Sequence, residues 1–136
     1  MRRSDQRRAA VFAVYRHDVN GRPLEDEFQR EDLPFTRELA RATLARQDEL
    51  DGLIDSHAHG WDIDRIQPLE RAIMRVALLE MLHGDSVPGH APIPPEGAIE
   101  EAVETAKTFC SDKAPSFVNG VLGAVLRDVR ENASAA

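Results

Sequence analysis

The run Pro68–His83, PLERAIMRVALLEMLH, constrains the fold more than any other stretch of this chain. Its apolar residues recur at spacings of three and four and form two faces, so we expect a helix that is buried from more than one side. Pro68 suits the first helical position, and Gly84 is expected to end the helix in the left-handed conformation. Glu80 projects into an apolar face, and a carboxylate there needs a bonding partner. We therefore predict a central helix with a structural role for Glu80.

Apolar periodicity places further helices on both sides of this one. Ser4 and Thr36 are predicted N-caps, and the proline-rich segment 85–97 is predicted to be a long loop, exposed and mobile near His90. The expected helices cover about 4–17, 24–28, 36–57, 98–110 and 116–131.

The predicted fold class is thus all-α, with about six to seven helices in two small helical bundles. The 136 residues are expected to form one domain, with an N-terminal lobe of about 1–60 and a C-terminal lobe of about 61–131. Residues 132–136 are predicted to be a disordered tail. Trp61 is predicted to wedge between the helix 36–57 and the central helix. Gly120, inside the last helix, is predicted to let another helix or a ligand backbone come close.

Composition excludes several classes of protein. No run of eighteen apolar residues and no signal-peptide core is present, so we expect a cytoplasmic protein without a membrane segment. The single cysteine, Cys110, permits no internal disulfide and is assigned to packing. His57 and His59 lie near aspartates but match no zinc signature. With no phosphate-binding glycine loop and no nucleophile elbow either, we expect no metal, no cofactor and no enzyme activity.

The charge of the chain is unevenly distributed. The net charge is −7, yet residues 1–16 carry five arginines against one aspartate. Arg3 and Arg7 lie one helical turn apart, and positive charge at a helix N-terminus opposes the helix dipole, which favours a binding use over a folding one. Tyr15 is expected to place its hydroxyl at the surface, although a purely apolar packing role is equally compatible with its position. Charge alone leaves open whether this basic end binds RNA or is only a solvated helix end.

Four stretches, in this order, resemble the NusB family of transcription antitermination factors. They are the arginine-bearing start that runs into Ala13-Val14-Tyr15; Gly60-Trp61 with Asp64-Arg65; the run ERAIMRVA at 70–77 with Glu80; and EAVETAK at 101–107 followed by FVNGVL at 117–122. The resemblance implies a small all-helical protein that binds the boxA element of ribosomal RNA operon transcripts together with the ribosomal protein NusE. It also implies a function with the Nus elongation factors that keeps RNA polymerase processive.

The resemblance also implies where RNA binds. Carried over by position, the RNA surface consists of Arg3, Arg7 and Arg8 on the first helix, with Phe109 and Phe117 flanking a groove between the last two helices. Arginines hold phosphates and exposed aromatic rings stack on unpaired bases. We add Tyr15 and Lys113 as RNA-binding candidates, and Glu70 as the candidate contact to NusE.

Two departures from the family leave alternatives open. Ser4, Asp5 and Gln6 interrupt the expected arginine run, and the loop 85–97 is longer than usual. The interrupted arginine run and the acidic body of the chain support an alternative, a protein–protein adaptor that keeps the fold with little or no RNA binding. Whether the chain is a monomer or a homodimer also stays open.

Overall fold

The computed structural model describes residues 1–135 and is all-helical over that range. Its elements are α1 (Arg3–Asn20), the 3-10 turn η1 (Leu24–Glu27), α2 (Pro34–Ala45), α3 (Gln47–His57), the 3-10 turn η2 (Ile63–Arg65), α4 (Pro68–His83), the 3-10 turn η3 (Gly84–Ser86), α5 (Pro95–Phe109) and α6 (Ala114–Ala135). The predicted fold class is confirmed. The described residues contain no helix that is long and apolar enough to cross a membrane.

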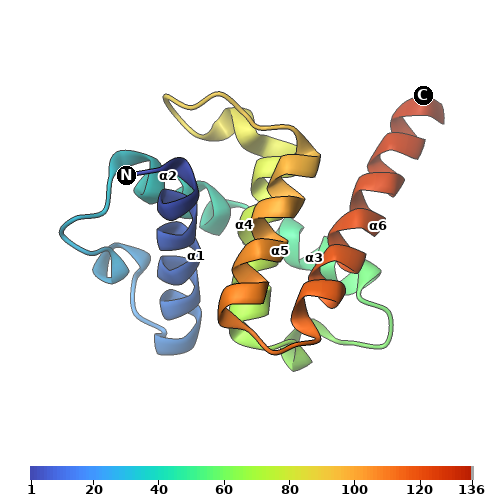
Figure 1. Ribbon diagram of the computed structural model, residues 1–136, viewed down its shortest axis with the longest axis horizontal. Helices are drawn as coiled ribbons and strands as arrows, with labels where there is room; N and C mark the ends of the chain where they lie inside the picture. Colours follow the sequence, from blue (N-terminus) through green and yellow to red (C-terminus); the bar gives the residue numbers. More distant parts are fainter. Residues whose placement is uncertain (136) are drawn as a thin grey trace.

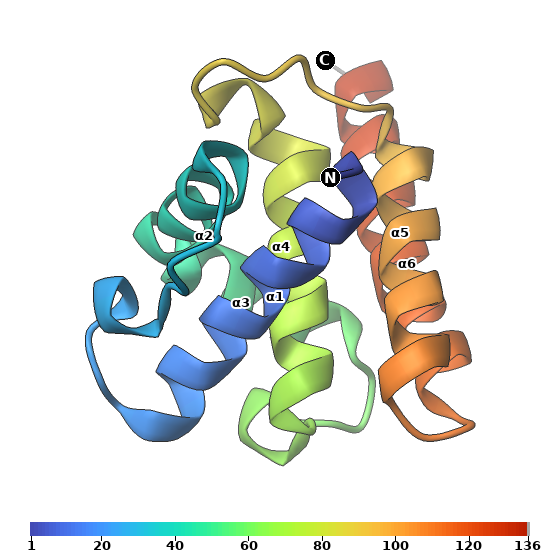
Figure 2. The ribbon, with the colours of Figure 1, turned by 60° about the vertical axis from the view of Figure 1, so that its left-hand side comes forward.

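Helix α4 is the centre of the fold, and its predicted bounds are confirmed. It packs against α1, α2, α3, α5 and α6, with α1 and α2 on one side and α5 and α6 on the other (Figures 1 and 2). All ten residues from Ala72 to Met81 are buried. One hydrophobic cluster extends through α4 into both groups of helices, so the two groups share a core.

The single helix predicted over 36–57 is wrong, because the chain breaks at Arg46 into α2 and α3. Arg46 has φ −116° and ψ 19°, outside the helical range. The break lets α2 pack on α1 while α3 packs on α4 and α6. In this packing α3 contacts the C-terminal helix α6 as well as the central helix α4.

Both predicted N-caps are wrong, and in each case the hydroxyl joins two helices instead. Leu33 is the N-cap of α2, because Pro34 takes the first helical position. The Thr36 hydroxyl donates to the backbone oxygen of Gln6 at 2.8 Å. The Ser4 hydroxyl donates to Oε1 of Glu101 at 2.8 Å and so links α1 to α5.

The segment between α4 and α5 folds back onto the body. Gly84 is right-handed, with φ −59°, so the predicted left-handed end of α4 is wrong. A side chain would be crowded there, since a Cβ on Gly84 would lie 3.0 Å from the Cβ of Pro92. The prediction of an exposed His90 is also wrong: its side chain is only 7% exposed, because the ring packs 4.4 Å from the ring of the buried Phe35.

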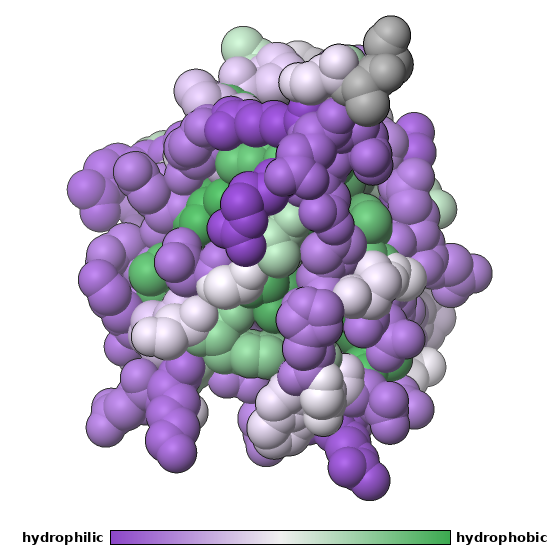
Figure 3. Space-filling model, turned by 90° about the vertical axis from the view of Figure 1, so that its right-hand side faces the viewer, coloured by the Kyte–Doolittle hydropathy of each residue, from purple (hydrophilic) through white to green (hydrophobic). Residues whose placement is uncertain are grey.

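The C-terminal helix is longer than the sequence predicted. Helix α6 continues to Ala135, so residues 132–135 of the predicted disordered tail are helical; Ala136 lies outside the described residues. A Cβ on Gly120 would meet no atom within 4 Å, so no close approach occurs there within the described chain. Seen from the side of α6, apolar residues lie in recesses between hydrophilic side chains (Figure 3).

Candidate nucleic-acid interface

The arginines of α1 lie on two different sides of the helix. Arg7 is 6% exposed, and its Nε donates to both carboxylate oxygens of Glu80, at 2.8 and 3.0 Å. This pair provides the partner that the sequence analysis required for Glu80. It also corrects the predicted role of Arg7, because a buried guanidinium bonded to a carboxylate is not available to an RNA phosphate.

Arg3, one helical turn before Arg7, also faces α2. Its guanidinium carbon lies 4.1 Å from the centroid of the Phe35 ring, and its Nη1 donates to the side chain of Gln6 at 3.0 Å. Arg3 is exposed, so it can still contact a phosphate. Because it sits over Phe35, however, it is separated from the predicted aromatic residues Phe109 and Phe117.

Burial shifts two pKa values in this region in opposite directions. It raises the pKa of Glu80, and the bonded Arg7 acts against this shift. It lowers the pKa of His90, and the nearby positive charges of Arg3 and Arg7 lower it further. Contacts among five side chains join this region into one cluster of charged and aromatic groups. Its members are Arg3, Arg7, Phe35, Glu80 and His90. We call it the Arg7 cluster.

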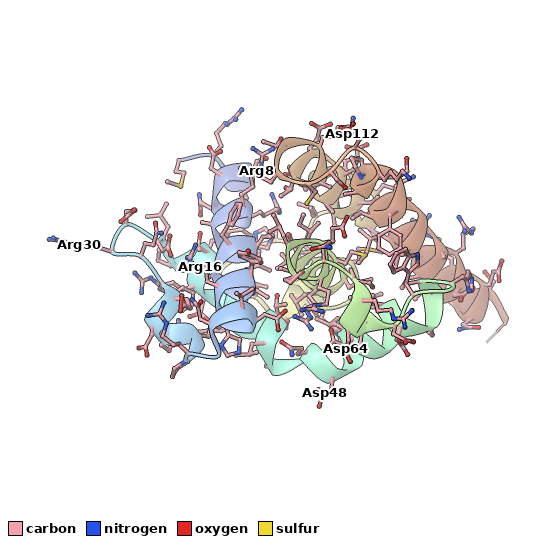
Figure 4. All side chains as sticks on the ribbon, turned by 90° about the horizontal axis from the view of Figure 1, so that it is seen from below. Arg8, Arg16, Arg30, Asp48, Asp64 and Asp112 are labelled. Atoms are coloured by element: carbon pink, nitrogen blue, oxygen red, sulfur yellow. The ribbon has the colours of Figure 1, made fainter. Side chains whose placement is uncertain are left out.

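Arg8 lies on the other side of α1, facing α5 (Figure 4). It shares that side with Phe12 and Tyr15, at helical spacings of four and three. The ring of Phe109 lies 5.8 Å from the Arg8 guanidinium carbon and makes an edge contact with Phe12 at 5.0 Å between centroids. Within the described residues the Nε of Arg8 has no hydrogen-bond partner. That nitrogen is buried, but Arg8 as a whole is partly exposed, and it lies beside an aromatic ring that is 47% exposed.

Two recesses continue this surface around the start of α4. The first is lined by Tyr15, Gln67, Pro68, Leu69, Glu70, Phe109, Cys110 and Ser111, and the second by Trp61, Arg65, Ile66, Gln67, Glu70, Ser111, Lys113 and Phe117. Gln67, Glu70 and Ser111 line both, so the two recesses adjoin at these residues and are treated together as one grooved surface. In Figure 4 the end of α4 lies between the α5–α6 turn, marked by Asp112, and η2, marked by Asp64. We call this surface the α4-end groove.

The α4-end groove brings together most of the predicted site. Tyr15, Phe109, Lys113 and Phe117 line it, and Glu70 lies in the part that both recesses share. Burial raises the pKa of Glu70, and a hydrogen bond from the backbone of Gln67 acts against this shift. Aromatic faces can stack on bases, cations can hold phosphates, and the amide and carboxyl groups of the floor can bond base edges.

Two residues of this surface were missed by the sequence reasoning. Trp61 is 52% exposed rather than wedged between helices, and its ring makes an edge contact with Phe117 at 6.4 Å between centroids. Phe12 joins Phe109 to Tyr15. The spacing Arg8, Phe12, Tyr15 was the available signal for Phe12, because residues four and seven apart share one helix face.

No group of three or more possible metal ligands occurs within residues 1–135. His57, which prompted the metal hypothesis, instead contacts Asp128 through its Nε2 and so links α3 to α6.

Comparison with known proteins gives one consistent result. Residues 4–127 match the sequence profile of the NusB family. The transcription antitermination protein NusB of Rubrobacter xylanophilus is 38% identical over 128 residues, which cover 90% of this chain and 88% of that protein. The NusB protein of Bacillus subtilis is 34% identical over 137 residues, covering 97% of this chain and 100% of that protein.

Solved structures show the same fold. The NusB structure from T. maritima superposes with a TM-score of 0.80 at 24% identity, covering 93% of this chain and 92% of that one. A crystal structure of the antitermination factors NusB and NusE in complex with dsRNA gives a TM-score of 0.75 at 24% identity, covering 94% of this chain and 99% of that one.

Proposed function

Because the chain belongs to the NusB family of transcription antitermination factors, we propose that it binds boxA RNA of ribosomal RNA operon transcripts together with NusE. The family resemblance found in the sequence is confirmed. As a transcription antitermination factor the protein is not an enzyme. In the proposed function it acts by binding, with the other Nus factors, and so helps RNA polymerase to stay processive.

The observation that supports RNA binding is the composition of the α4-end groove. It presents three aromatic side chains of the predicted site, Tyr15, Phe109 and Phe117, beside the cation Lys113. Arg8 stands next to Phe109 at the edge of the groove. This combination of stacking surfaces and positive charge is typical of proteins that bind single-stranded RNA.

Support for NusE as the partner comes from the solved complex of NusB with NusE and dsRNA. Glu70 stays our candidate for this contact, because it lies within the groove at the start of α4. Because that complex contains double-stranded RNA, the test has to compare single-stranded with double-stranded RNA. We propose an unpaired strand, since base stacking on Phe109 and Phe117 requires bases that are not paired in a helix.

The test is a fluorescence-anisotropy titration of labelled boxA RNA, a scrambled strand and a boxA duplex, each with and without NusE. We expect tightest binding to single-stranded boxA with NusE present, weakening as salt rises. The Arg8→Ala/Lys113→Ala variant should flatten the slope of log K against log salt by about two units. Equal affinity for boxA and scrambled RNA, with and without NusE, would contradict the proposal.

One observation favours the adaptor as a second candidate. Arg7, predicted to contact phosphate, is bonded to Glu80, and the recess beside Arg8 is lined by Glu100, Glu101 and Glu104. Both facts reduce the positive potential available to RNA. An adaptor would bind NusE with the same affinity whether or not RNA is present.

A further inference from the structure

The α4-end groove has a feature that its predicted residues do not explain, which is the exposed indole of Trp61. It is the single tryptophan of the chain and is 52% exposed. Indole rings contribute most to folding when they are buried. A tryptophan left half in solvent beside a second aromatic ring therefore points to a use other than the core.

The backbone holds the indole in this outward position. Gly60 has φ +82°, a conformation that side-chain-bearing residues rarely adopt. The N–H of Trp61 donates to the backbone oxygen of the buried Ala58 at 2.9 Å. The turn that follows α3 thus fixes the point from which Trp61 leaves the body, next to the first turns of α6.

The chemistry around Trp61 selects the kind of ligand. Phe117 makes an edge contact with the indole, and the exposed cations Arg65 and Lys113 line the same recess. Among the ion pairs within residues 1–135, none involves Arg65 or Lys113. Aromatic faces flanked by unpaired cations match a nucleobase joined to charged phosphates.

The recess is also continuous with the rest of the groove. Gln67, Glu70 and Ser111 line the part that contains Phe109 as well as the part that contains Trp61. A strand that stacks a base at Phe109 can therefore continue along the floor to Phe117.

We propose that Trp61 and Phe117 form a second stacking subsite, which holds an unpaired RNA base at the end of the groove remote from Tyr15. Arg65 and Lys113 hold the phosphates beside that base. This inference rests on the proposed RNA binding and adds to it the residue that fixes where the strand leaves the protein.

The lone tryptophan makes a direct test possible. Its emission is recorded while unlabelled boxA RNA is added to the full chain with NusE present, and binding is followed separately by anisotropy of labelled RNA. Stacking of a base on the indole quenches its emission, so we expect quenching that saturates at the same RNA concentration as the anisotropy signal. NusE alone should leave the emission unchanged.

Variants separate stacking from charge. Trp61→Leu should weaken RNA binding about 5- to 150-fold, the usual range for loss of one stacked base, without changing the salt slope. Trp61→Phe should retain most of the affinity. Lys113→Ala should instead lower the salt slope by about one unit. The matched control is Val129→Ala, which trims another exposed apolar residue, twelve positions after Phe117 in α6, and should bind RNA as the wild type does.

The outcomes distinguish the subsite from the proposed function. If RNA binds but the emission stays constant and Trp61→Leu binds as the wild type does, the subsite is refuted while RNA binding stands. If the wild type binds no RNA, both fail. If the emission responds to NusE without RNA and Trp61→Leu loses only NusE affinity, the surface binds protein and the inference is wrong. If circular dichroism shows that Trp61→Leu is unfolded, the test rests on two other results. These are the quenching of the wild-type emission by RNA and the RNA affinity of Trp61→Phe.

Discussion

Arg7 and Arg8 are neighbours in sequence, yet they belong to two regions that use arginine and aromatic rings in opposite ways. In the Arg7 cluster the guanidinium is buried and bonded to Glu80. Beside the α4-end groove, Arg8 is only partly buried and lies against the exposed ring of Phe109. The same residue types therefore join helices at one place and lie at the proposed binding surface at the other.

The difference shows that the arginines at a basic helix end have to be sorted by the helix side on which they lie before any of them is assigned to RNA binding. Arg3 and Arg7 share a side of α1 that is occupied by Phe35 of α2 and His90 of the loop. Because α1 packs against α2 there, that side contributes to stability. The side of Arg8 faces α5 and leads into the groove.

The largest effect is expected from breaking the Arg7–Glu80 pair. Arg7→Met leaves the buried Glu80 without its partner, so the free energy of unfolding should fall by about 3–5 kcal/mol. Urea denaturation followed by circular dichroism measures this loss. RNA affinity per folded molecule should be unchanged, because Arg7 belongs to the Arg7 cluster and not to the groove.

The control replaces both partners of the pair. Arg7→Met/Glu80→Leu removes the uncompensated carboxylate and should recover most of the lost stability. A single Arg7→Met variant that lost RNA affinity while keeping its unfolding free energy would reverse the distinction between the two regions.

An intermediate effect is expected at Phe109. Removing its exposed ring in Phe109→Ala should weaken RNA binding by about 1–3 kcal/mol, the cost of one lost stacking contact. The unfolding free energy should fall by only about 1 kcal/mol, since the main packing loss is the edge contact with Phe12. Anisotropy and urea denaturation measure the two quantities.

Phe35→Leu is the matched aromatic variant on the other side. Phe35 is 5% exposed and packs on His90 and Arg3, so its replacement should lower stability and leave RNA affinity intact. Equal losses of RNA affinity in Phe109→Ala and Phe35→Leu would show that the two regions are not separate.

The smallest effect is a pH dependence within the Arg7 cluster. The pKa of His90 is lowered from its usual 6.5 in the folded protein, so below pH 6.5 the unfolded chain takes up the proton more readily. The stability that depends on neutral His90 is thus fully present above pH 6.5 and declines as pH falls towards the lowered value. Wild type should lose more stability than His90→Phe between pH 7.5 and 5.5.

The other charged groups that face His90 are Arg3, Arg7 and Glu80. Glu80 has a raised pKa, and its protonation acts in the opposite direction as pH falls. Because Glu80 is present in both proteins, the difference between them reports mainly on His90. Identical denaturation midpoints at both pH values would contradict a role for His90 in this dependence.

The sequence predicted the elements that depend on local pattern. The bounds of α4 followed from Pro68 and the apolar spacing, and the need of Glu80 for a partner followed from its place on an apolar face. The break at Arg46 could not be predicted, since it depends on tertiary packing: both helices contact α4, but α2 also packs on α1 and α3 on α6. The same holds for Arg7 and Trp61, whose exposure is decided by Glu80 and by the turn at Gly60, respectively, and not by helical spacing.

The first turn of α4 belongs to both the groove and the core. Gln67, Pro68 and Glu70 line the groove, and the fully buried run begins at Ala72. A shift of the floor would disturb the packing of the helices that contact α4, so we expect this surface to change little when RNA binds. The entropy lost on complex formation should then come mainly from ordering the strand, and we expect higher affinity for strands that are already extended and unpaired in solution.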